Sequence, residues 1–439
     1  MPNMATPLSA ACVPSTFTGL GLFGGEVLSI NTALVTNYSA AVPSELRLTA
    51  PAIQVNNATF CNVTVSYTHP GQHENILVET WLPVENPAWN SRLQAVGGGG
   101  WVAGRFAFSY ETMMGALGDG FATTTTDAGL GSSEDPANWA LNSPGNVNWY
   151  NINNFASVSL NDQAILSKAL VKSFYGRGPA FSYWNGCSQG GRQGMQLAQR
   201  YPDAYDGISV GAPVLYSSLV GGSLLWSQQV MNMLGEYPYG CEMDAISAAA
   251  ITACDGLDGI VDGIVSNPDA CLAAFDPFRL VGSSVQGCRQ AGNRTVEISA
   301  AAAIVANATW HGMVSTKGVP TWYGLSLGAD VSSEGDGQFT VPGLAATNCT
   351  SGICVGNPIA LTLAWFEQFL AKGEPGFDIS KLTHIEFDHL VHSGRQLYRS
   401  ALDTDDPDLS QFRDAGGKMV TWHGLVSSSF MSLCDSPKR

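Results

Sequence analysis

The sequence predicts an α/β fold in which a doubly wound, mostly parallel sheet carries helices on both faces. Short apolar runs alternate with segments of helical periodicity across the first half of the chain. A Gly-x-Ser-x-Gly motif, Gly186-Cys-Ser-Gln-Gly190, stands between a strand-like run and a helix-like run. The composition, with 45% hydrophobic and 13% charged residues among 439, suits a large packed core.

The net charge of the chain argues against two classes of binding partner, nucleic acids and anionic membranes. The formal net charge is −16 at pH 7, from 20 Lys and Arg against 36 Asp and Glu. Such a balance repels phosphate backbones and anionic lipid headgroups. The sequence also holds no apolar run of the roughly 18 residues that a membrane-spanning helix requires. We therefore expect neither nucleic acid nor a membrane as a partner, and the sequence does not determine the oligomeric state.

The first strands are expected within the first 130 residues. Residues 1–75 are polar and irregular, apart from one stretch whose alternation suggests strands that open the sheet. Three later runs alternate between two faces or are continuously apolar, and the last of them ends in Asp127, as a central strand would. The runs expected as strands are 46–65, 74–83, 93–96 and 121–127.

A glycine run, Gly97-Gly-Gly-Gly-Trp-Val-Ala-Gly104, comes directly after the third of these strand segments. In serine hydrolases of this architecture, such a run lets backbone N–H groups approach the substrate carbonyl. Gly98 and Gly99 are therefore candidate donors in an oxyanion hole. A flexible loop is the alternative.

The Gly-x-Ser-x-Gly motif has the context that a nucleophile elbow requires. Residues 180–184 form an aromatic run that is typical of a buried strand. Residues 192–201 have helical periodicity and are stopped by Pro202. Small residues flank the serine, as a sharp turn demands. We predict that Ser188 is a nucleophile, with an ordinary glycine-rich turn as the alternative.

The strand–helix alternation continues around the motif and is then interrupted. Residues 151–175 show apolar positions at helical spacing and predict a long amphipathic helix. Short strands are expected at 206–213 and again at 416–424. Between them, residues 217–385 hold six of the ten cysteines and show no such alternation. We interpret this stretch as an insertion that lies over the sheet as a lid.

Inside the insertion, Cys254 to Cys271 enclose a loop rich in aspartate and glycine. Carboxylates stand at 255, 258, 262 and 269, with glycines between them. Oxygen ligands crowded into a short, flexible loop suit Ca²⁺, which takes about 6–8 oxygens. The spacing is not that of an EF-hand, and a cysteine at each end would close the loop covalently. We expect a structural calcium site, with a solvated acidic turn as the alternative.

The cysteine content bears on localisation. Ten cysteines in a chain rich in glycine and aromatic residues indicate an oxidising compartment. Six N-x-S/T sites agree with secretion. The first seven residues lack the basic and long apolar segments of a signal peptide. We expect a secreted protein whose signal peptide has been removed or whose first exon is missing from the sequence. The six sites are Asn37, Asn57, Asn62, Asn293, Asn307 and Asn348.

Around the motif, the sequence resembles the fungal and bacterial tannase and feruloyl esterase family. The resemblance is specific and covers nearly all of residues 10–425. The stretches that carry it are 97–100, 173–176, Gly186-Cys-Ser-Gln-Gly-Gly-Arg-Gln-Gly194, 198–203, 206–213, the loop 254–271, 405–409 and 416–424.

The resemblance implies an α/β-hydrolase core with a doubly wound sheet and a large inserted lid domain that helps to bind the aromatic acid part of an ester. With the boundaries of the insertion taken from the sequence pattern, the chain divides into core residues 1–216, lid residues 217–385 and a returning core segment, 386–439. Ser188 would be the acylated nucleophile, and the backbone N–H of Gln189 would lie in the oxyanion hole.

The resemblance also implies a ligand set for the calcium ion and one disulfide. Cys187 would pair with a cysteine next to the catalytic histidine, which would tie nucleophile and base together. The implied calcium ligands are the side chains of Asp255, Asp258 and Asp262 and the backbone carbonyls of Ile260 and Ile264.

The sequence departs from the family pattern near its end. In the family, the strand that ends in His-Gly is followed after two residues by the catalytic Asp, whereas here His423-Gly-Leu-Val is followed by Ser427. The later His-Cys pair is absent as well. We therefore expect the core to lack its last strand and helix, and the tail from about residue 426 to be foreign to the family. Our hypothesis for the cause is a mis-processed exon boundary after Leu425.

The remaining histidines and cysteines do not supply the missing partners. The histidines near the return to the core, His384, His389 and His392, are expected to be structural or surface residues. Cys187 and Cys434 remain after pairing, and a bond between them would depend on the course of the tail. The pairs expected are Cys12–Cys61, Cys241–Cys288, Cys254–Cys271 and Cys349–Cys354.

Together these features predict a secreted carboxylic ester hydrolase that acts on phenolic esters, feruloyl or galloyl, through a serine acyl-enzyme. Without the catalytic Asp and His, Ser188 would be a weak nucleophile and activity would be low. The alternatives are a catalytically silent member that binds aromatic ligands, or a mis-spliced gene product, and lastly a calcium-stabilised structural domain. The sequence does not separate ferulic from gallic esters, because that choice depends on lid side chains.

Overall fold

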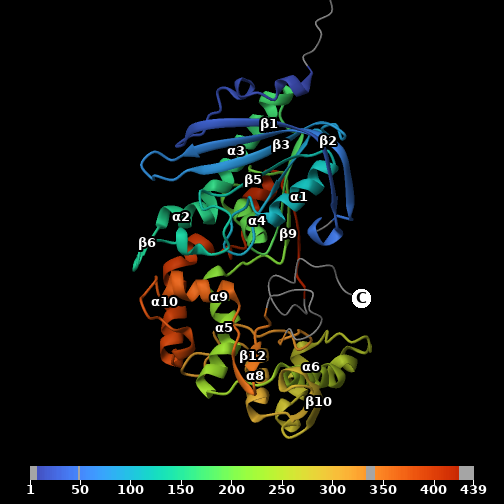
Figure 1. Ribbon diagram of the computed structural model, residues 1–439, viewed down its shortest axis with the longest axis vertical. Helices are drawn as coiled ribbons and strands as arrows, with labels where there is room; N and C mark the ends of the chain where they lie inside the picture. The colour runs from blue at the N-terminus through green and yellow to red at the C-terminus, as the bar shows by residue number, and fades with distance from the viewer. Residues whose placement is uncertain (1–6, 48–49, 333–341, 425–439) are drawn as a thin grey trace, which may run out of the picture.

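The structure of the chain, a computed structural model, describes residues 7–47, 50–332 and 342–424. Its centre is an eight-stranded sheet with the order β1-β2-β3-β5-β4-β8-β9-β14. Figure 1 shows the sheet with its helices in the upper part of the view and a second, mainly helical part below. The predicted α/β fold is confirmed.

Long antiparallel strands form one side of the sheet. β1 (Glu26–Val42), β2 (Ile53–Thr68) and β3 (Ile76–Glu85) pair antiparallel in chain order. β1 lies at the outer edge, and nearly all of its residues are exposed or half-buried. Its sequence therefore carries little apolar alternation. The prediction that residues 1–75 are irregular outside 46–65 is wrong for β1.

The other side of the sheet is parallel. It contains β5 (Ala122–Thr126), β4 (Arg92–Val96), β8 (Phe181–Cys187), β9 (Gly207–Gly211) and β14 (Lys418–Trp422). β5 also pairs antiparallel with β3, so it lies at the centre of the sheet, as predicted. The sheet is mixed rather than mostly parallel, because no crossover helix connects the first three strands.

Helices cover both faces of the sheet. α1 (Ala107–Gly118) packs on the face that carries Phe60. α3 (Ser159–Tyr175) packs on the face that carries Val63, and α4 (Gln189–Arg200) lies beside it. Phe60 and Val63 are three residues apart on β2 and so point to opposite faces. The sheet is therefore buried between two layers of helix.

The helix predicted for 151–175 is present as three consecutive segments. α2 (Trp149–Asn153) continues into a π-helical turn (Asn154–Val158) and then into α3. A π-helical turn inside an α-helix frequently marks a functional site. It displaces backbone carbonyls from their usual partners, and these carbonyls matter for the site described below.

Residues 217–402 form the helical part in the lower half of Figure 1. The predicted division between 385 and 386 falls inside α10, which packs along α5 and so lies in space with the helical part. The elements are α5 (Ser217–Leu234), α6 (Gly240–Cys254), α7 (Pro268–Ala274), α8 (Ala300–His311), α9 (Ala360–Ala364), a second π-helical turn (Trp365–Leu370) and α10 (His384–Leu402), with hairpins β10 (Ser284–Cys288) and β11 (Arg294–Glu297), and β12 (Thr347–Thr350) and β13 (Ile353–Gly356). Elsewhere lie the hairpin β6 (Leu141–Ser143) and β7 (Asn146–Val147), and α11 (Ser410–Asp414).

Disulfides fasten both parts of the molecule. All four expected pairs are confirmed, namely Cys12–Cys61, Cys241–Cys288, Cys254–Cys271 and Cys349–Cys354. Cys187 is disulfide-bonded as well, and Cys434 lies outside the described residues. Within the ranges that the structure describes, no helix is long and apolar enough to cross a membrane.

Candidate active site

Ser188 stands at the sharp turn between the end of β8 and the start of α4. Its φ of 57° and ψ of −116° lie in a region that costs a non-glycine residue about 1–3 kcal/mol. The Ser188 N–H donates to the carbonyl of Gly211 (3.0 Å), and the Ser188 carbonyl accepts the N–H of Arg192 (2.9 Å). The strand and the helix predicted around the serine are confirmed, and the turn has the form of a nucleophile elbow.

The glycines of the motif make room for this turn. A Cβ atom on Gly186 would lie well inside van der Waals contact with the carbonyl group of Gly190, one turn further on. A Cβ atom on Gly190 would lie 2.9 Å from the carbonyl oxygen of Gly98. Backbone therefore meets backbone at the elbow, and the glycine run after β4 packs directly against it.

The glycine run has its own internal hydrogen bonds. The N–H of Gly98 donates to Gln193 Oε1 (2.9 Å), and Gln193 Nε2 donates to the carbonyl of Ala103 (2.9 Å). The N–H of Gly99 donates to the carbonyl of Val102 (3.2 Å). The two N–H groups predicted to face a substrate are thus already engaged, Gly98 by the side chain of Gln193 and Gly99 by the fold-back of the run itself. Among the described residues, the N–H of Gly100 has no such acceptor.

Ser188 opens onto an apolar pocket of about 80 Å³ between the sheet and the helical part. Two of its polar residues, Ser188 and Gln189, come from the elbow, and Gly100 comes from the glycine run. The rest of the lining is mostly apolar or aromatic, and Ser217 and Thr362 are its polar members. These lining residues are Trp101, Phe155, Val214, Ser217, Val220, Gly221, Leu224, Leu361, Thr362, Trp365 and Leu402.

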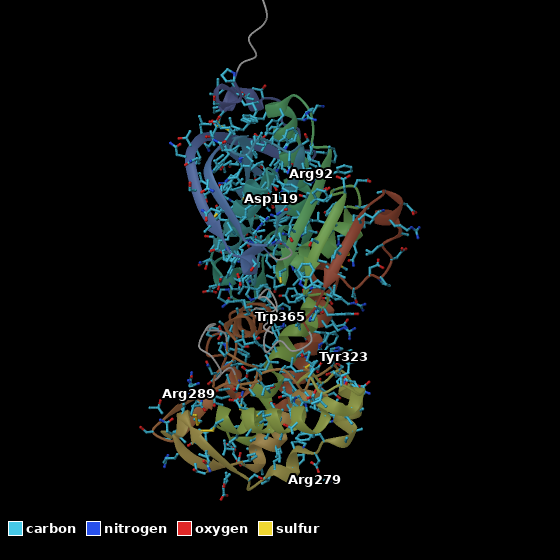
Figure 2. The ribbon with its side chains drawn as sticks, turned by 90° about the vertical axis from the view of Figure 1, so that its right-hand side faces the viewer. Arg92, Asp119, Arg279, Arg289, Tyr323 and Trp365 are labelled. Carbon is cyan, nitrogen blue, oxygen red and sulfur yellow. A yellow bond between two sulfur atoms is a disulfide. The ribbon has the colours of Figure 1, made fainter. Side chains whose placement is uncertain are left out.

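Aromatic rings from both parts of the chain meet at this pocket. The ring of Trp101 lies 5.9 Å from that of Trp365 and 4.5 Å from that of Phe369. Trp101 Nε1 also donates to the carbonyl of Leu361 (3.1 Å). Figure 2 shows Trp365 where the sheet part meets the helical part. The pocket is therefore a joint product of the core and the insertion.

A buried arginine lies behind the elbow. Arg192 is 1% exposed, and its Nε donates to Gln189 Oε1 (2.7 Å). Burial lowers the pKa of Arg192 to about 9, so the side chain is a cation at neutral pH. Sequence reasoning did not single out Arg192, Gln193, Phe155 or Trp365. The available signal was the polar pair Arg192-Gln193 among glycines and small residues on an otherwise core-facing helix.

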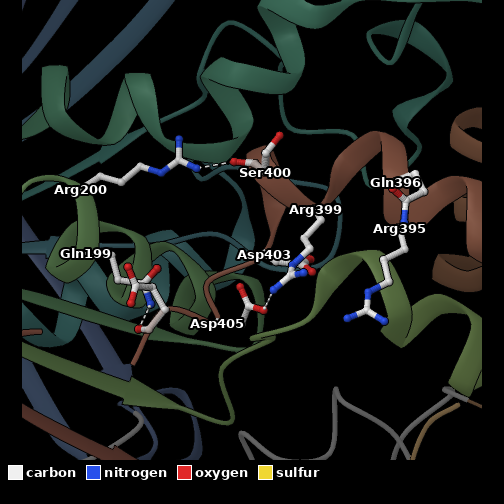
Figure 3. A pocket seen from close by; sticks show the side chains of 9 residues that line it. Gln199, Arg200, Arg395, Gln396, Arg399, Ser400, Asp403 and Asp405 are labelled. Atoms are coloured by element: carbon white, nitrogen blue, oxygen red, sulfur yellow. Dashed lines mark hydrogen bonds and ion pairs between the residues drawn. The ribbon is translucent and has the colours of Figure 1, made fainter. Parts of the chain in front are cut away.

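A larger cavity, of about 510 Å³, lies elsewhere, between the end of α4 and α10. Its lining is polar and includes Arg200, Arg395 and Arg399. Figure 3 shows Arg399 paired with Asp405, at 2.9 Å, and Arg200 directed at the main chain of Ser400. This cavity holds no elbow and no apolar wall, so the smaller pocket at Ser188 is the better candidate for chemistry.

No histidine, aspartate or glutamate among the described residues lines the Ser188 pocket. His384, His389 and His392 lie on α10, where His384 Nε2 contacts the carbonyl of Val314 (2.9 Å). His423 follows the end of β14. Ser427, which stands where the family pattern has the catalytic Asp, and the tail that follows it lie outside the described residues.

The acidic loop of the insertion folds around its own carboxylates. Asp255 Oδ1 accepts the N–H groups of Asp262 (3.0 Å) and Gly263 (2.9 Å). Asp258 Oδ1 and Asp262 Oδ1 accept the N–H groups of Ile260 (2.9 Å) and Ile264 (3.0 Å). Within the described ranges, no three His, Cys, Asp or Glu side chains converge as metal ligands would. The donors suit calcium in kind, but the carboxylates are not gathered at one point.

Comparison with known proteins shows which family has this sequence and fold. A family profile described as "Tannase and feruloyl esterase" matches residues 61–433. A probable feruloyl esterase of Arthroderma benhamiae is 38% identical over 407 residues, which are 92% of this chain and 70% of that one. A tannase of Aspergillus oryzae is 28% identical over 83% of this chain and 65% of that one. The solved tannin acyl hydrolase of Aspergillus niger superposes with a TM-score of 0.79 at 29% identity, covering 96% of this chain and 74% of that one.

The mixed sheet, the elbow after β8 and the helices on both faces define an α/β-hydrolase fold. Within it, the chain belongs to the tannase and feruloyl esterase family, a family of carboxylic ester hydrolases. The recognition made from the sequence motifs is thereby confirmed.

Proposed function

We propose that the protein hydrolyses phenolic carboxylic esters through a serine acyl-enzyme. The observation that carries the proposal is Ser188, held at a strained elbow and facing an apolar, aromatic-walled pocket. Strained backbone at a nucleophile is retained where it presents the reacting atom. The names of the relatives, feruloyl esterase and tannase, support the ester class.

In this mechanism Ser188 Oγ attacks the ester carbonyl carbon, and the carbonyl oxygen becomes an oxyanion. The N–H of Gln189, the first residue of α4, has no acceptor within its helix and would donate to that oxygen. Gly100 would supply the second N–H, in place of Gly98 and Gly99. The oxyanion then collapses, the bond to the alcohol oxygen breaks, and the leaving group takes a proton from water; a second water hydrolyses the acyl-enzyme and regenerates the serine hydroxyl.

The serine proton needs an acceptor, and the described residues place no basic side chain on the pocket. With water as the only proton acceptor we expect slow turnover that still depends on Ser188, because its hydroxyl is not deprotonated near neutral pH. The same observation favours a second candidate function, in which the pocket binds aromatic ligands without turnover.

The size of the pocket bears on the substrate. Its volume of about 80 Å³ is smaller than the roughly 150 Å³ apolar cavity that holds benzene. An aromatic acyl group would therefore be fully enclosed only if wall side chains such as Leu361 moved outward.

The test is hydrolysis of methyl ferulate by the 439-residue protein, compared with Ser188→Ala. Ser393→Ala, an exposed serine on α10, is the matched control. We expect turnover that is lost in Ser188→Ala and kept in the control. Equal background from all three proteins would exclude catalysis by Ser188. Binding of ferulate to that inactive protein, followed by tryptophan fluorescence, would then establish the ligand-binding function.

Two further proposals concern stability and location. We propose that Asp255, Asp258 and Asp262, with the carbonyls of Ile260 and Ile264, hold a structural Ca²⁺. In the hydrogen bonds found within the loop only Oδ1 of each carboxylate is engaged, which leaves Oδ2 for a cation.

We also propose that the protein is secreted into an oxidising compartment, and the four disulfides described above support this location.

A further inference from the structure

Arg192 is buried yet contacts no carboxylate among the described residues, and Asp403 acts on it only from beyond ion-pair distance. Arg105, for comparison, pairs with Glu79 (3.0 Å) and Asp127 (3.3 Å). No ion pair of Arg192 is found within the described residues, although the side chain is almost fully buried. A buried cation without a counter-ion is strongly unfavourable unless its N–H groups find other acceptors. The hydrogen-bond acceptors of Arg192 therefore indicate its role.

Those partners are uncharged oxygens on three separate segments. Nε donates to Gln189 Oε1 (2.7 Å) in the first turn of α4. Nη2 donates to the carbonyl of Phe155 (2.9 Å) and Nη1 to that of Ala156 (3.1 Å), both in the π-helical turn. Nη1 also lies 3.5 Å from the carbonyl of Leu402 at the end of α10.

Each of the three segments contributes a wall of the Ser188 pocket. Gln189, Phe155 and Leu402 all line it. The guanidinium carbon also lies 5.3 Å from the centre of the Phe155 ring, in cation–π contact. One side chain therefore holds the predicted oxyanion residue, an aromatic wall and the end of the insertion at once.

We propose that Arg192 is a positioning residue that assembles the substrate pocket by clamping the elbow helix, the π-helical turn and the end of α10 together. The role deepens the proposed ester hydrolysis and rests on it for its catalytic consequence. Through the Gln189 side chain, Arg192 fixes the backbone N–H that would donate to the oxyanion. Through the Phe155 carbonyl, it fixes the aromatic wall against which the acyl group would bind.

The chemistry of the guanidinium explains why an arginine occupies this place. The π-helical turn displaces carbonyls from the regular helical ladder, and buried carbonyls need donors. A guanidinium presents five N–H groups in a rigid plane and reaches several acceptors in different directions. A lysine has the charge but concentrates its donors at one atom, and a methionine has neither. The two substitutions therefore separate charge from fork geometry.

The experiment compares Arg192→Met and Arg192→Lys with Arg200→Met. Arg200 lies two turns further along α4 and donates to the carbonyl of Ser400, but it has no hydrogen bond to the π-helical turn among the described residues, so Arg200→Met is a matched control for residues 154–158. Amide hydrogen exchange of the whole protein reports on the clamp without any need for catalysis. For both Arg192 variants we expect exchange to rise about tenfold or more in residues 154–158 and 400–403, because buried carbonyls lose their donors. Arg200→Met should leave residues 154–158 unchanged, whereas residues 400–403 lose the hydrogen bond from Arg200 and are not used for this control.

The kinetic arm uses methyl ferulate and 4-nitrophenyl acetate at a temperature where every variant is folded. Arg192→Met keeps the backbone N–H of Gln189 but no longer fixes its position, so we expect kcat to fall for both esters, by at most the roughly 10²–10³-fold that complete loss of one oxyanion donor costs. The Michaelis constant KM should rise for the ferulate ester alone, because only that acyl group uses the Phe155 wall. A role limited to overall stability would change neither constant below the melting temperature.

The outcomes are distinct. Unchanged exchange in 154–158 and 400–403, a uniform rise over the whole chain, or full restoration by Arg192→Lys would overturn the clamp. Wild-type protein that hydrolyses neither ester would refute the proposed function, and the exchange measurement would still decide whether Arg192 holds the three segments together.

Discussion

The elbow at Ser188 and the acidic loop at Cys254–Cys271 are two glycine-rich stretches that look alike in sequence and differ in physics. Both contain a residue in the left-handed region, Ser188 at φ 57° and Gly259 at φ 92°. The loop places glycine where the backbone needs positive φ, which costs little. The elbow places serine there, because the hydroxyl has to stand at that point, and it accepts the strain.

The two stretches also use their other glycines differently. At the elbow, Gly186 is needed for space, because backbone approaches backbone. In the loop, a Cβ atom on Gly256 would meet only Val261, at 3.7 Å. The elbow is buried and fixed by tertiary packing, whereas the loop is exposed and closed by a disulfide. Glycine content alone therefore does not distinguish a catalytic turn from a structural loop.

The largest effect is expected at Gly186. Gly186→Ala would force Cβ into the carbonyl group of Gly190, and neither backbone can move without disturbing β8 or α4. We expect a loss of about 3 kcal/mol in the free energy of unfolding, and of any hydrolysis, since overpacking costs about 1–3 kcal/mol or more. Urea denaturation measures it. If the variant unfolds with a free energy within about 1 kcal/mol of the wild type, Gly186 does not approach the carbonyl group of Gly190 as closely as described.

Removal of calcium should have the next largest effect, and it acts on the loop alone. Because a bound ion stabilises the folded state by mass action, excess calcium should add about 2.7 kcal/mol at 100 times its dissociation constant. Thermal unfolding with chelator and after calcium is restored measures this. Asp262→Asn should be insensitive to the chelator. Identical melting temperatures for the wild type in both conditions would exclude the metal site.

Gly259→Ala tests the demand for positive φ in the loop. The new side chain would meet no atom within 4 Å, so the expected cost is conformational only. A left-handed conformation costs an alanine about 1–2 kcal/mol relative to glycine. Thermal unfolding should show a loss of this size. No loss would mean that the loop adopts another conformation in solution.

Ser188→Gly and Ser188→Ala compare the strain at the elbow directly. Both remove the hydroxyl, but only glycine relieves the positive φ. After the greater entropy of glycine in the unfolded chain is subtracted, Ser188→Gly should be more stable than Ser188→Ala by about 1 kcal/mol. Chemical denaturation of the pair measures the difference. Equal stability would show that the turn is unstrained.

The smallest effect is expected for Gly256→Ala. Gly256 lies in a short 3-10 turn, its φ is not positive, and its nearest contact is ordinary. Since alanine lowers the entropy of the unfolded chain, we expect a gain of about 0.5 kcal/mol. A clear loss, in the same thermal assay as Gly259→Ala, would indicate that the loop is packed more tightly than its exposure suggests.

Much of the fold could be predicted because its signals are local. β3, β4, β5, β8, β9 and the helix through 151–175 carry period-two or helical patterns that depend on neighbours in sequence. β1 could not be predicted, because an edge strand with little buried surface leaves no alternation to detect. The elbow was predicted, since strand, turn and helix are adjacent in the chain. The roles of Gly98 and Gly99 were not, because Gln193, about a hundred residues away, takes up the N–H of Gly98.

The sequence by itself therefore determined the family, the elbow and the disulfide framework, which rest on residue identities and on short spacings. Only the tertiary structure decided the pocket and the clamp behind it. Trp101 meets Leu361 across 260 residues, and Arg192 reaches Leu402 across 210. No periodicity encodes such contacts, because they arise when the insertion packs onto the sheet and buries a cation with acceptors on its own helix and on two segments far away in the chain. That packing turns a serine at a turn into a candidate active site.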